Sequence, residues 1–434
     1  MDFLFFILLS AVMMIRPEEL FEGLTGARLY LWTIGISTVV AMPKLLYALS
    51  WDQLRMRSIS VCVLGFFASI FISAQLRGRS VIGMEYCEEF FKVVLYYFLL
   101  IAVVDTPERL RAFLGWMVLF VGGIALVAFL HFYAIVDFPL LDPVIEEIRY
   151  DKVTGEEILS RRALASGIFG DPNDLAMILA LGIGCCGYHA ESTPAPSARI
   201  FWLLPIIPLF FVITLTGSRG GMLSLLAGFA AWCYGRMGWR AGVPFAVVGI
   251  VGLLAVAGGR GGNITGGGTA HERLVLWGSG LGDYFKSVFY IPFGLGPGYY
   301  IEDYGLLAHN SFINSYVEYG LFGGGLFAVA FVTALWQTDR IGNPVPSGEW
   351  AVTMRPYMLA IVFAYAAGCF SLSRHLSLPT YMIFGIAMVY TSMAADPPER
   401  TIVSSAWLRW AVPLAVLILA ALKIFTQVLG QAGV

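Results

Sequence analysis

The chain contains thirteen apolar runs that are long enough to cross, or nearly cross, a lipid bilayer, for which a helix needs about 20 residues. Because lipid offers an open backbone no hydrogen-bond partner, such runs are expected to be α-helical. The runs therefore predict an all-α, polytopic integral membrane protein with about 12–14 transmembrane helices. They are residues 2–15, 29–49, 58–75, 87–104, 112–135, 173–189, 200–217, 220–236, 241–258, 311–335, 356–372, 376–394 and 406–428.

The composition agrees with a membrane protein and argues against other classes. Only 13% of the residues are charged, about half the fraction that is usual in soluble domains, and the mean hydropathy is +0.77. No block of like charges suggests a nucleic-acid partner. The six cysteines lie in or beside apolar runs without zinc-ligand spacing, which is typical of buried hydrophobic residues. Without a repeat or linker, residues 1–434 are expected to form a single membrane domain.

The short basic loops predict the orientation, because such loops prefer the cytoplasm. Arg55 with Arg57, and Arg236 with Arg240, are examples that fall inside if the N-terminus, whose first run has no cleavage site, is inside. The two longest polar loops, 136–172 and 259–310, then both face outward because they are four runs apart. The short junction 217–220 falls on the same side.

Three ionisable residues at this predicted outer side are the main functional candidates, because charges near membrane depth are costly. Arg219 lies between glycines that leave its guanidinium unshielded; the alternative is an arginine that merely anchors a helix end at the interface. Arg273 and Trp277 would share one face of a helix at i,i+4. The alternative for that pair is an amphipathic helix on the membrane surface.

His309 is the third candidate and stands just before the run 311–335. Its near-neutral pKa suits a general base, although a lone histidine at a helix end is usually without function. Asn310 follows it directly. Glu318 lies about two and a half turns further along the helix, so contact with His309 is not assumed.

Several other polar residues are weaker candidates, each with a structural alternative. Asp171 and Asn173 suit helix capping, Arg161 and Arg162 suit phosphate binding or solvation, and Arg374-His375 is expected to face outward between two late runs. Arg77 and Arg79 would form an ion network with Glu85, Glu88, Glu89 and Lys92, or would recognise an acceptor. No residue set has metal-ligand spacing, so we expect neither a metal nor a cofactor.

Two arginines and a histidine on one side suit a particular kind of transfer. Guanidinium groups bind phosphate oxygens with two hydrogen bonds and stay charged, and a histidine takes a proton from a hydroxyl. Together they favour transfer to an alcohol from a donor whose leaving group is a phosphate or pyrophosphate, with arginines in place of a metal.

The motifs, taken in order, resemble those of the O-antigen ligase/polymerase superfamily of bacterial envelope glycosyltransferases. The likeness covers about residues 165–325 in detail, although the family is usually drawn with 12 spans and thirteen runs are counted here. The matching segments are Gly167-x-Phe169-x-Asp171-Pro172-Asn173-x-Leu175-Ala176, Thr216-Gly217-Ser218-Arg219-Gly220, Arg273-x3-Trp277, Gly294-x-Gly296-x-Gly298, and His309-Asn310 with Glu318-x-Gly320.

The resemblance implies an enzyme of the bacterial inner membrane with a periplasmic active site. It implies an inverting, metal-independent transfer from an undecaprenyl-pyrophosphate-linked glycan to a hydroxyl of a glycan, lipid or protein acceptor. His309 would be the base or acceptor-orienting residue, and Arg219 and Arg273 the donor pyrophosphate ligands. Polymerase and ligase remain alternatives, as does a transporter or flippase for polysaccharide or lipid-linked glycan, which should show internal repeats and midplane charges.

Overall fold

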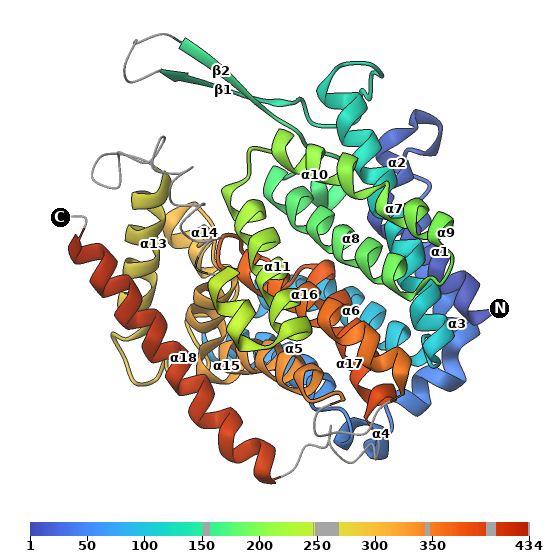
Figure 1. Ribbon diagram of the computed structural model, residues 1–434. Helices are drawn as coiled ribbons and strands as arrows, with labels where there is room; N and C mark the ends of the chain where they lie inside the picture. The colour runs from blue at the N-terminus through green and yellow to red at the C-terminus, as the bar shows by residue number, and fades with distance from the viewer. Residues whose placement is uncertain (151–156, 246, 248–268, 343–347, 396–404, 433–434) are drawn as a thin grey trace. The chain divides into compact units, whose positions relative to one another are not determined.

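The computed structural model describes residues 1–150, 157–245, 247, 269–342, 348–395 and 405–432, and this part is almost entirely helical (Figure 1). Its elements are α1 (Asp2–Ile15), α2 (Pro17–Leu20), η1 (Glu22–Leu24), α3 (Leu29–Ala48), α4 (Trp51–Arg55), α5 (Ser58–Leu76), α6 (Ser80–Val103), α7 (Pro107–Phe132), β1 (Ile145–Tyr150), β2 (Glu157–Arg162), η2 (Gly167–Phe169), α8 (Pro172–Ser192), α9 (Pro196–Leu203), α10 (Ile206–Leu215), α11 (Arg219–Met237), α13 (Thr269–Tyr284), α14 (Tyr299–Tyr304), α15 (Ser311–Asp339), α16 (Glu349–Gly368), α17 (Leu378–Ala394) and α18 (Ser405–Ala432).

Eight helical segments in the described part are long and apolar enough to cross a membrane. They are α3, α5, α7, α8, the consecutive pair α9–α10, α15, α16 and the greater part of α18, while α1 and α17 are apolar but shorter. The chain is therefore a helical, multi-pass membrane protein. The finer number of 12–14 spans stays a prediction. The runs 87–104 and 220–236 lie in α6 and α11, which are not among these helices, and the run 241–258 lies largely outside the described residues.

The other twelve runs coincide with helices, and the largest differences in a boundary are at the starts of α6 and α16, each seven residues before its run. Helix α6 begins at Ser80, before the predicted start at residue 87. Its early turns carry charges that pair along the helix surface, with Lys92 Nζ 2.6 Å from Glu89 Oε1 and 3.8 Å from Glu88 Oε1. Opposite charges three or four residues apart are compatible with a helix. The polar residues before position 87 therefore belong to α6 and do not mark its start.

The contacts divide the chain into two compact units, each assembled from three segments. Unit 1 consists of Met1–Leu45, Ala102–Ala246 and Glu349–Gly368, and unit 2 of Leu46–Ile101, Val247–Gly348 and Cys369–Val434. Each unit thus joins helices that are far apart in the sequence. This division does not test the expectation of one functional domain over residues 1–434.

Within unit 1, α8 packs against α7, α10, α11 and α16, and α11 runs along α16. Glycines on α11 recur every seven residues and face these neighbours. A Cβ at Gly221 would lie 2.2 Å from Cβ of Ala176, and one at Gly235 would lie 2.8 Å from Cα of Pro356. Small residues allow this close approach, which membrane helices use because apolar burial alone gives them little attraction in lipid.

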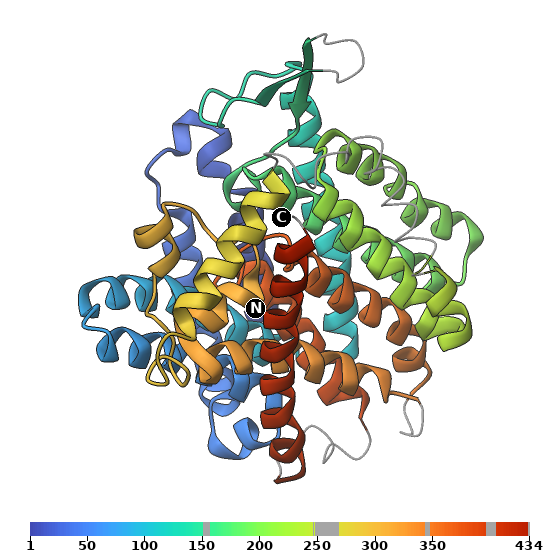
Figure 2. The same cartoon turned by 90° about the vertical axis from the view of Figure 1, so that its left-hand side faces the viewer.

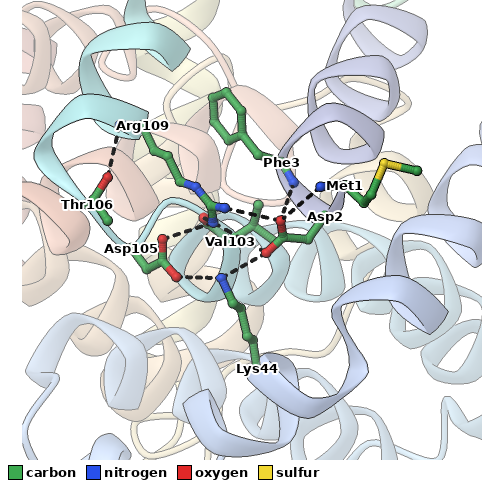
Figure 3. Close-up of polar contacts among 8 residues, drawn as sticks. All are labelled: Met1, Asp2, Phe3, Lys44, Val103, Asp105, Thr106 and Arg109. Carbon is green, nitrogen blue, oxygen red and sulfur yellow. Dashed lines mark hydrogen bonds and ion pairs between the residues drawn. The ribbon is translucent and has the colours of Figure 1, made fainter.

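A cluster of ion pairs joins three helix ends of unit 1 (Figure 3). Asp2, at the start of α1, lies 2.8 Å from Lys44 Nζ on α3 and 3.2 Å from Arg109 Nη2 on α7. Asp105, just before α7, binds the same two cations at 2.5 and 2.9 Å. The four side chains therefore neutralise one another and fix the start of α1 against α3 and α7.

The predicted loop 136–172 contains an antiparallel β-hairpin that extends from the helices of unit 1 (Figure 1). Strands β1 and β2 pair from Ile145 opposite Arg162 to Tyr150 opposite Glu157. Both strands contain isoleucine, a residue that favours extended structure. The loop predicted at 136–172 therefore contains secondary structure of its own.

In unit 2, α15 is the central helix and packs against α5, α17, α18 and α13. Figure 2 shows α18 beside α13, in agreement with their contacts. Gly323 of α15 faces Ser69 of α5 so closely that a Cβ would lie 2.4 Å from its Oγ. This packing brings the end of α5 to the first half of α15.

Candidate functional site

His309 is held in an unusual backbone conformation at the start of α15. Its φ of +50° lies in the left-handed region, which is uncommon for residues other than glycine and costs about 1–2 kcal/mol. Asn310 is the N-cap, and its Oδ1 accepts hydrogen bonds of 3.1 Å from the amides of Phe312 and Ile313. The cap therefore fixes the turn on which His309 stands.

Trp277 ties α13 to the same turn, because its indole Nε1 donates a hydrogen bond to the carbonyl of Ala308. The predicted helix for this segment is confirmed as α13. Arg273 therefore lies on the same face as Trp277, about 6 Å earlier along the axis. Both residues are half-buried, and together with His309 and Asn310 they form a first set of candidate residues, in unit 2.

The glycine-rich run 294–298 packs on α15 where that helix is interrupted. Gly320 has φ +70° and ψ −169°, so the regular helix stops and restarts there. Four hydrogen bonds between the loop and α15 satisfy backbone groups that the interruption frees. They are Leu295 N to Val317 O (2.8 Å), Gly296 N to Glu318 O (3.0 Å), Leu321 N to Ile291 O (2.7 Å) and Phe322 N to Pro292 O (3.0 Å).

The backbones at this crossing approach too closely for a side chain. A Cβ at Gly294 would lie 2.4 Å from the carbonyl carbon of Glu318, and one at Gly320 would lie 2.4 Å from the amide nitrogen of Phe293. Both glycines also have positive φ. The run was interpreted as a turn that leads the chain back to the membrane; it is more specifically a backbone clamp on α15.

Arg77 and Arg79, at the end of α5, hold the other side of this loop. Arg77 Nε donates to the carbonyl of Gly294 at 2.7 Å, and Arg79 Nη1 lies 2.7 Å from Glu302 Oε2. The expected network with Glu85, Glu88 and Glu89 is wrong for these two arginines. Because both arginines follow α5, they lie beside the loop that contains Gly294, and they bind its carbonyl groups and the Glu302 carboxylate instead.

Glu318 is buried on α15, away from the start of the helix, and its carboxylate faces a residue from another segment. Its Oε2 lies 4.0 Å from Nε2 of His375, and its Oε1 accepts a hydrogen bond of 3.4 Å from the amide of Tyr300. His375, which with Arg374 forms the turn expected on the outer side of the membrane, is only 5% exposed. Burial, with a smaller contribution from Arg374, lowers the pKa of His375 to about 3. The sequence analysis did not predict this contact; the four-residue spacing of Asn310, Asn314 and Glu318 is the signal that could have indicated a buried polar face on α15.

In unit 1, the first turns of α8 and α11 meet. Asp171 caps α8, with Oδ1 accepting from the amide of Asn173 at 2.7 Å, so the predicted cap is confirmed. Ser218 caps α11 by accepting from Gly221 N at 2.9 Å, and its hydroxyl donates to Asn173 Oδ1 at 2.7 Å. The positive ends of two helix dipoles therefore converge.

The neighbours Arg161 and Arg162 have different roles, because successive strand residues point to opposite faces. Arg161 Nε pairs across the hairpin with Glu146 at 3.2 Å. Arg162 instead donates to the carbonyl of Thr216 at 2.9 Å and to Asn173 Oδ1 at 3.3 Å. Arg162 thus joins the hairpin to the junction of α8 and α11.

Arg219 is the first residue of α11, directly after the cap Ser218. It is exposed and forms no side-chain hydrogen bond or ion pair with any described residue. A guanidinium beside two helix N-termini creates a positive surface that suits an anion. Asp171, Asn173, Arg162 and Arg219 form the second set of candidate residues, in unit 1.

Neither the protein-family models nor the curated proteins searched match this chain. Within the described part, no three His, Cys, Asp or Glu side chains are grouped so that they could hold a metal ion. The two sets of side chains must therefore be interpreted from their own chemistry.

Proposed function

We propose that the protein is a membrane glycosyltransferase of the O-antigen ligase/polymerase type. It would transfer a glycan from an undecaprenyl-pyrophosphate donor to the hydroxyl of a glycan, lipid or protein acceptor. The observation that carries the proposal is the His309 turn, in which an indole and a helix cap hold a half-buried imidazole on a strained backbone. Such strain is concentrated at functional sites in proteins.

The proposed reaction assigns a role to each set of residues. His309 takes the proton from the acceptor hydroxyl, and the hydroxyl oxygen attacks the anomeric carbon from the side opposite the pyrophosphate. Arg273, in unit 2, binds oxygens of the pyrophosphate and stabilises the charge that develops on it. Arg219, in unit 1, is the second candidate ligand for pyrophosphate oxygens. Arg162, Asp171 and Asn173 orient the segment that presents Arg219. The transfer inverts the anomeric centre and uses no metal.

The proposed location is the bacterial inner membrane, with 12–14 spans and a cytoplasmic N-terminus. The basic short loops support this orientation. Loops 136–172 and 259–310 would then form the periplasmic side of the enzyme, where the lipid-linked donor is available, and the apolar helices would contact membrane lipids.

The decisive experiment incubates the protein, purified in lipid nanodiscs, with a lipid-linked oligosaccharide and candidate acceptors. A ladder of lengthened glycans identifies a polymerase, and a single transfer to another lipid or protein identifies a ligase. Absence of any glycan transfer across glycan, lipid and protein acceptors would overturn the proposal.

The role of His309 is tested by His309→Ala, which should abolish transfer while the protein remains folded and in the membrane. His131→Ala is the matched control, since His131 is half-buried at the end of α7 and its ring contacts a backbone carbonyl. Full activity of His309→Ala would exclude a catalytic base at this position.

The role of Arg219 is tested by Arg219→Ala and Arg219→Lys. Both should weaken donor binding, because lysine keeps the charge but loses the two-pronged contact with phosphate. Arg199→Ala removes another exposed arginine of unit 1 and should leave donor binding unchanged.

A lipid-linked glycan transporter is the second candidate function. The interruption of α15 beside buried Glu318 favours it, since transporters place ionisable groups at interrupted helices. In liposomes, movement of labelled lipid-linked glycan across the bilayer without a new glycosidic bond would support this alternative.

A further inference from the structure

The first three turns of α15 carry a stripe of buried polar side chains that the proposed transfer does not use. Asn310, Asn314 and Glu318 are spaced by four residues and are at most 2% exposed. They follow one face of the helix for about 12 Å. The stripe begins at the residue next to His309 and ends beside His375. Polar residues at this depth are costly in a membrane protein and mark functional positions.

The turn between α16 and α17 covers this stripe. Ser311 N donates to the carbonyl of Cys369 at 2.8 Å, and Ser373 Oγ donates to Asn314 Oδ1 at 3.0 Å. His375, from the same turn, reaches Glu318 at 4.0 Å. The polar side chains are therefore enclosed within unit 2 rather than facing lipid.

Polar atoms of this enclosure lack hydrogen-bond partners among the described residues. They are Nδ2 of Asn310 and Asn314, the hydroxyls of Tyr300 and Tyr319, and both ring nitrogens of His375. Asn314 and Tyr319 lie beside the Glu318 carboxylate, but Asn314 Nδ2 and Tyr319 OH complete no hydrogen bond of ordinary geometry. Proteins leave only a few such groups per 100 residues. Their concentration around one carboxylate indicates that a small ligand completes the cluster.

The chemistry of these atoms favours water over a cation. Two amide nitrogens, two hydroxyls and a histidine N–H are able to donate, whereas cations such as Ca²⁺ require about six oxygen ligands. The Asn310 amide cannot simply be turned round, because its oxygen caps two backbone amides. Water accepts from these donors and donates to Glu318, which satisfies both sides.

We propose that the Asn310–Asn314–Glu318 stripe is a hydrated polar file, in which Glu318 accepts the proton that His309 removes from the acceptor hydroxyl. The source of the proton rests on the proposed function. As the acceptor oxygen bonds to the anomeric carbon, the bond to pyrophosphate breaks and the leaving group keeps the electron pair. The hydroxyl proton passes to His309 and then through water to the Glu318 carboxylate, which restores neutral His309.

Several titratable and charged groups from the surrounding segments influence the protonation state of the Glu318 carboxylate. Tyr86 of α6, Tyr300 of α14, Tyr319 of α15 and His375 face Glu318, and Arg374 lies beside His375. Arg79 and Glu302 lie further out, around Tyr86. His375 remains neutral because it is buried, so Glu318 is the member of the pair that receives the proton.

Hydration is tested by X-ray radiolytic footprinting of the full-length protein in nanodiscs, which oxidises side chains next to bound water. Tyr300 and Tyr319 should be modified several-fold faster than Tyr390, which is equally buried in unit 2. Equal, background-level modification of all three tyrosines would overturn the hydrated file. This readout does not depend on glycan transfer.

Proton acceptance is tested by Glu318→Gln, which keeps the shape of the side chain but removes its charge. We expect kcat to fall about 100-fold, the solvent isotope effect to rise and donor binding to persist. Glu318→Asp should recover part of kcat, and Glu85→Gln, at an exposed carboxylate of α6, should match wild type.

The two experiments separate this inference from the proposed function. Unchanged kcat in Glu318→Gln would overturn the proton-accepting role even if the file is hydrated. If wild type transfers no glycan, the proposed function and the proton step both fail, and the footprint alone then supports or overturns the water file.

Discussion

At the scale of single residues, the clamp on α15 depends on glycine for two separable reasons. Gly294 combines positive φ with a backbone 2.4 Å from where a Cβ would lie, whereas Gly305 has φ +69° but nothing within 4 Å. Gly294→Ala should therefore destabilise the protein by about 2–5 kcal/mol, the sum of left-handed strain and steric conflict. Thermal unfolding in detergent, followed by circular dichroism, measures the loss.

Gly305→Ala is the matched control and should cost only the strain, about 1–2 kcal/mol. Equal losses in the two variants would show that the close approach at Gly294 is relieved by movement of the loop. The glycines were visible as a motif in the sequence, but the sequence did not reveal what they contact, because Glu318 and Gly320 belong to another element.

His375 gives the fold a dependence on pH. Burial lowers the pKa of its imidazole from 6.5 to about 3, so between these values the unfolded chain binds a proton that the folded protein does not. Stability should be complete above pH 6.5 and fall by about 1.4 kcal/mol per pH unit as the pH decreases toward 3.

His375→Gln should flatten this acidic slope, measured as the unfolding midpoint between pH 7 and pH 4. If the unfolding midpoint of His375→Gln falls with decreasing pH as steeply as that of the wild type, groups other than His375 cause the acid sensitivity. The sequence placed His375 at a turn between two membrane helices but did not indicate its burial, because such a turn also folds inward when a polar stripe lies beside it.

At the scale of elements, hydrophobic runs predicted the helices well and their interruptions poorly. The start of α15 was expected near residue 311 and is confirmed, because Asn310 is a strong cap. The interruption at Gly320 was not predicted, since one glycine in an apolar run is common in membrane helices. It requires hydrogen bonds from a loop that precedes the helix, and local sequence does not encode such a contact.

The ion-pair cluster of Figure 3 supports a prediction for the helix ends of unit 1. Arg109 lies between Asp2 and Asp105, and its side chain is 30% exposed. Arg109→Gln should leave Asp105 with Lys44, and Asp2 with Lys44 and the Met1 amine, and lower stability by about 1–2 kcal/mol, with a smaller loss at high salt. Denaturation at two salt concentrations measures it.

Arg55→Gln is the comparison for this cluster, because Arg55 pairs with Asp52, whose side chain is 79% exposed. It should change stability by less than about 0.5 kcal/mol. A loss as large as that of Arg109→Gln, or a loss at Arg109 that is insensitive to salt, would contradict the electrostatic explanation.

At the scale of the whole molecule, composition and run length were sufficient for the class of protein but not for its internal division. Each unit joins three segments that are distant in the sequence, and no linker or change in composition marks the boundaries. The candidate residues show the same limit. The motifs brought Asn173 and Ser218 into consideration singly, but the hydrogen bond between them follows from the packing of α8 against α11.

The predicted orientation is the property of the whole chain on which the proposed location depends. Single cysteines at exposed positions of a cysteine-free variant test it with a membrane-impermeant thiol reagent on intact cells. Asp137→Cys and Leu306→Cys, in the two long loops, should be labelled from outside. Asp52→Cys and Glu349→Cys should be labelled only after the cells are opened.

The pattern of labelling distinguishes a reversed orientation from a wrong number of spans, because successive loops lie on alternating sides of the membrane. Complete reversal would keep the number of spans but place the proposed site in the cytoplasm, where the periplasmic reaction fails. Labelling of positions 137 and 306 from opposite sides would instead mean an odd number of spans between them, so that one of the runs from 173 to 258 does not cross. If the run that does not cross is 220–236 or 241–258, Arg219 and His309 would lie on opposite sides of the membrane and would need separate functions.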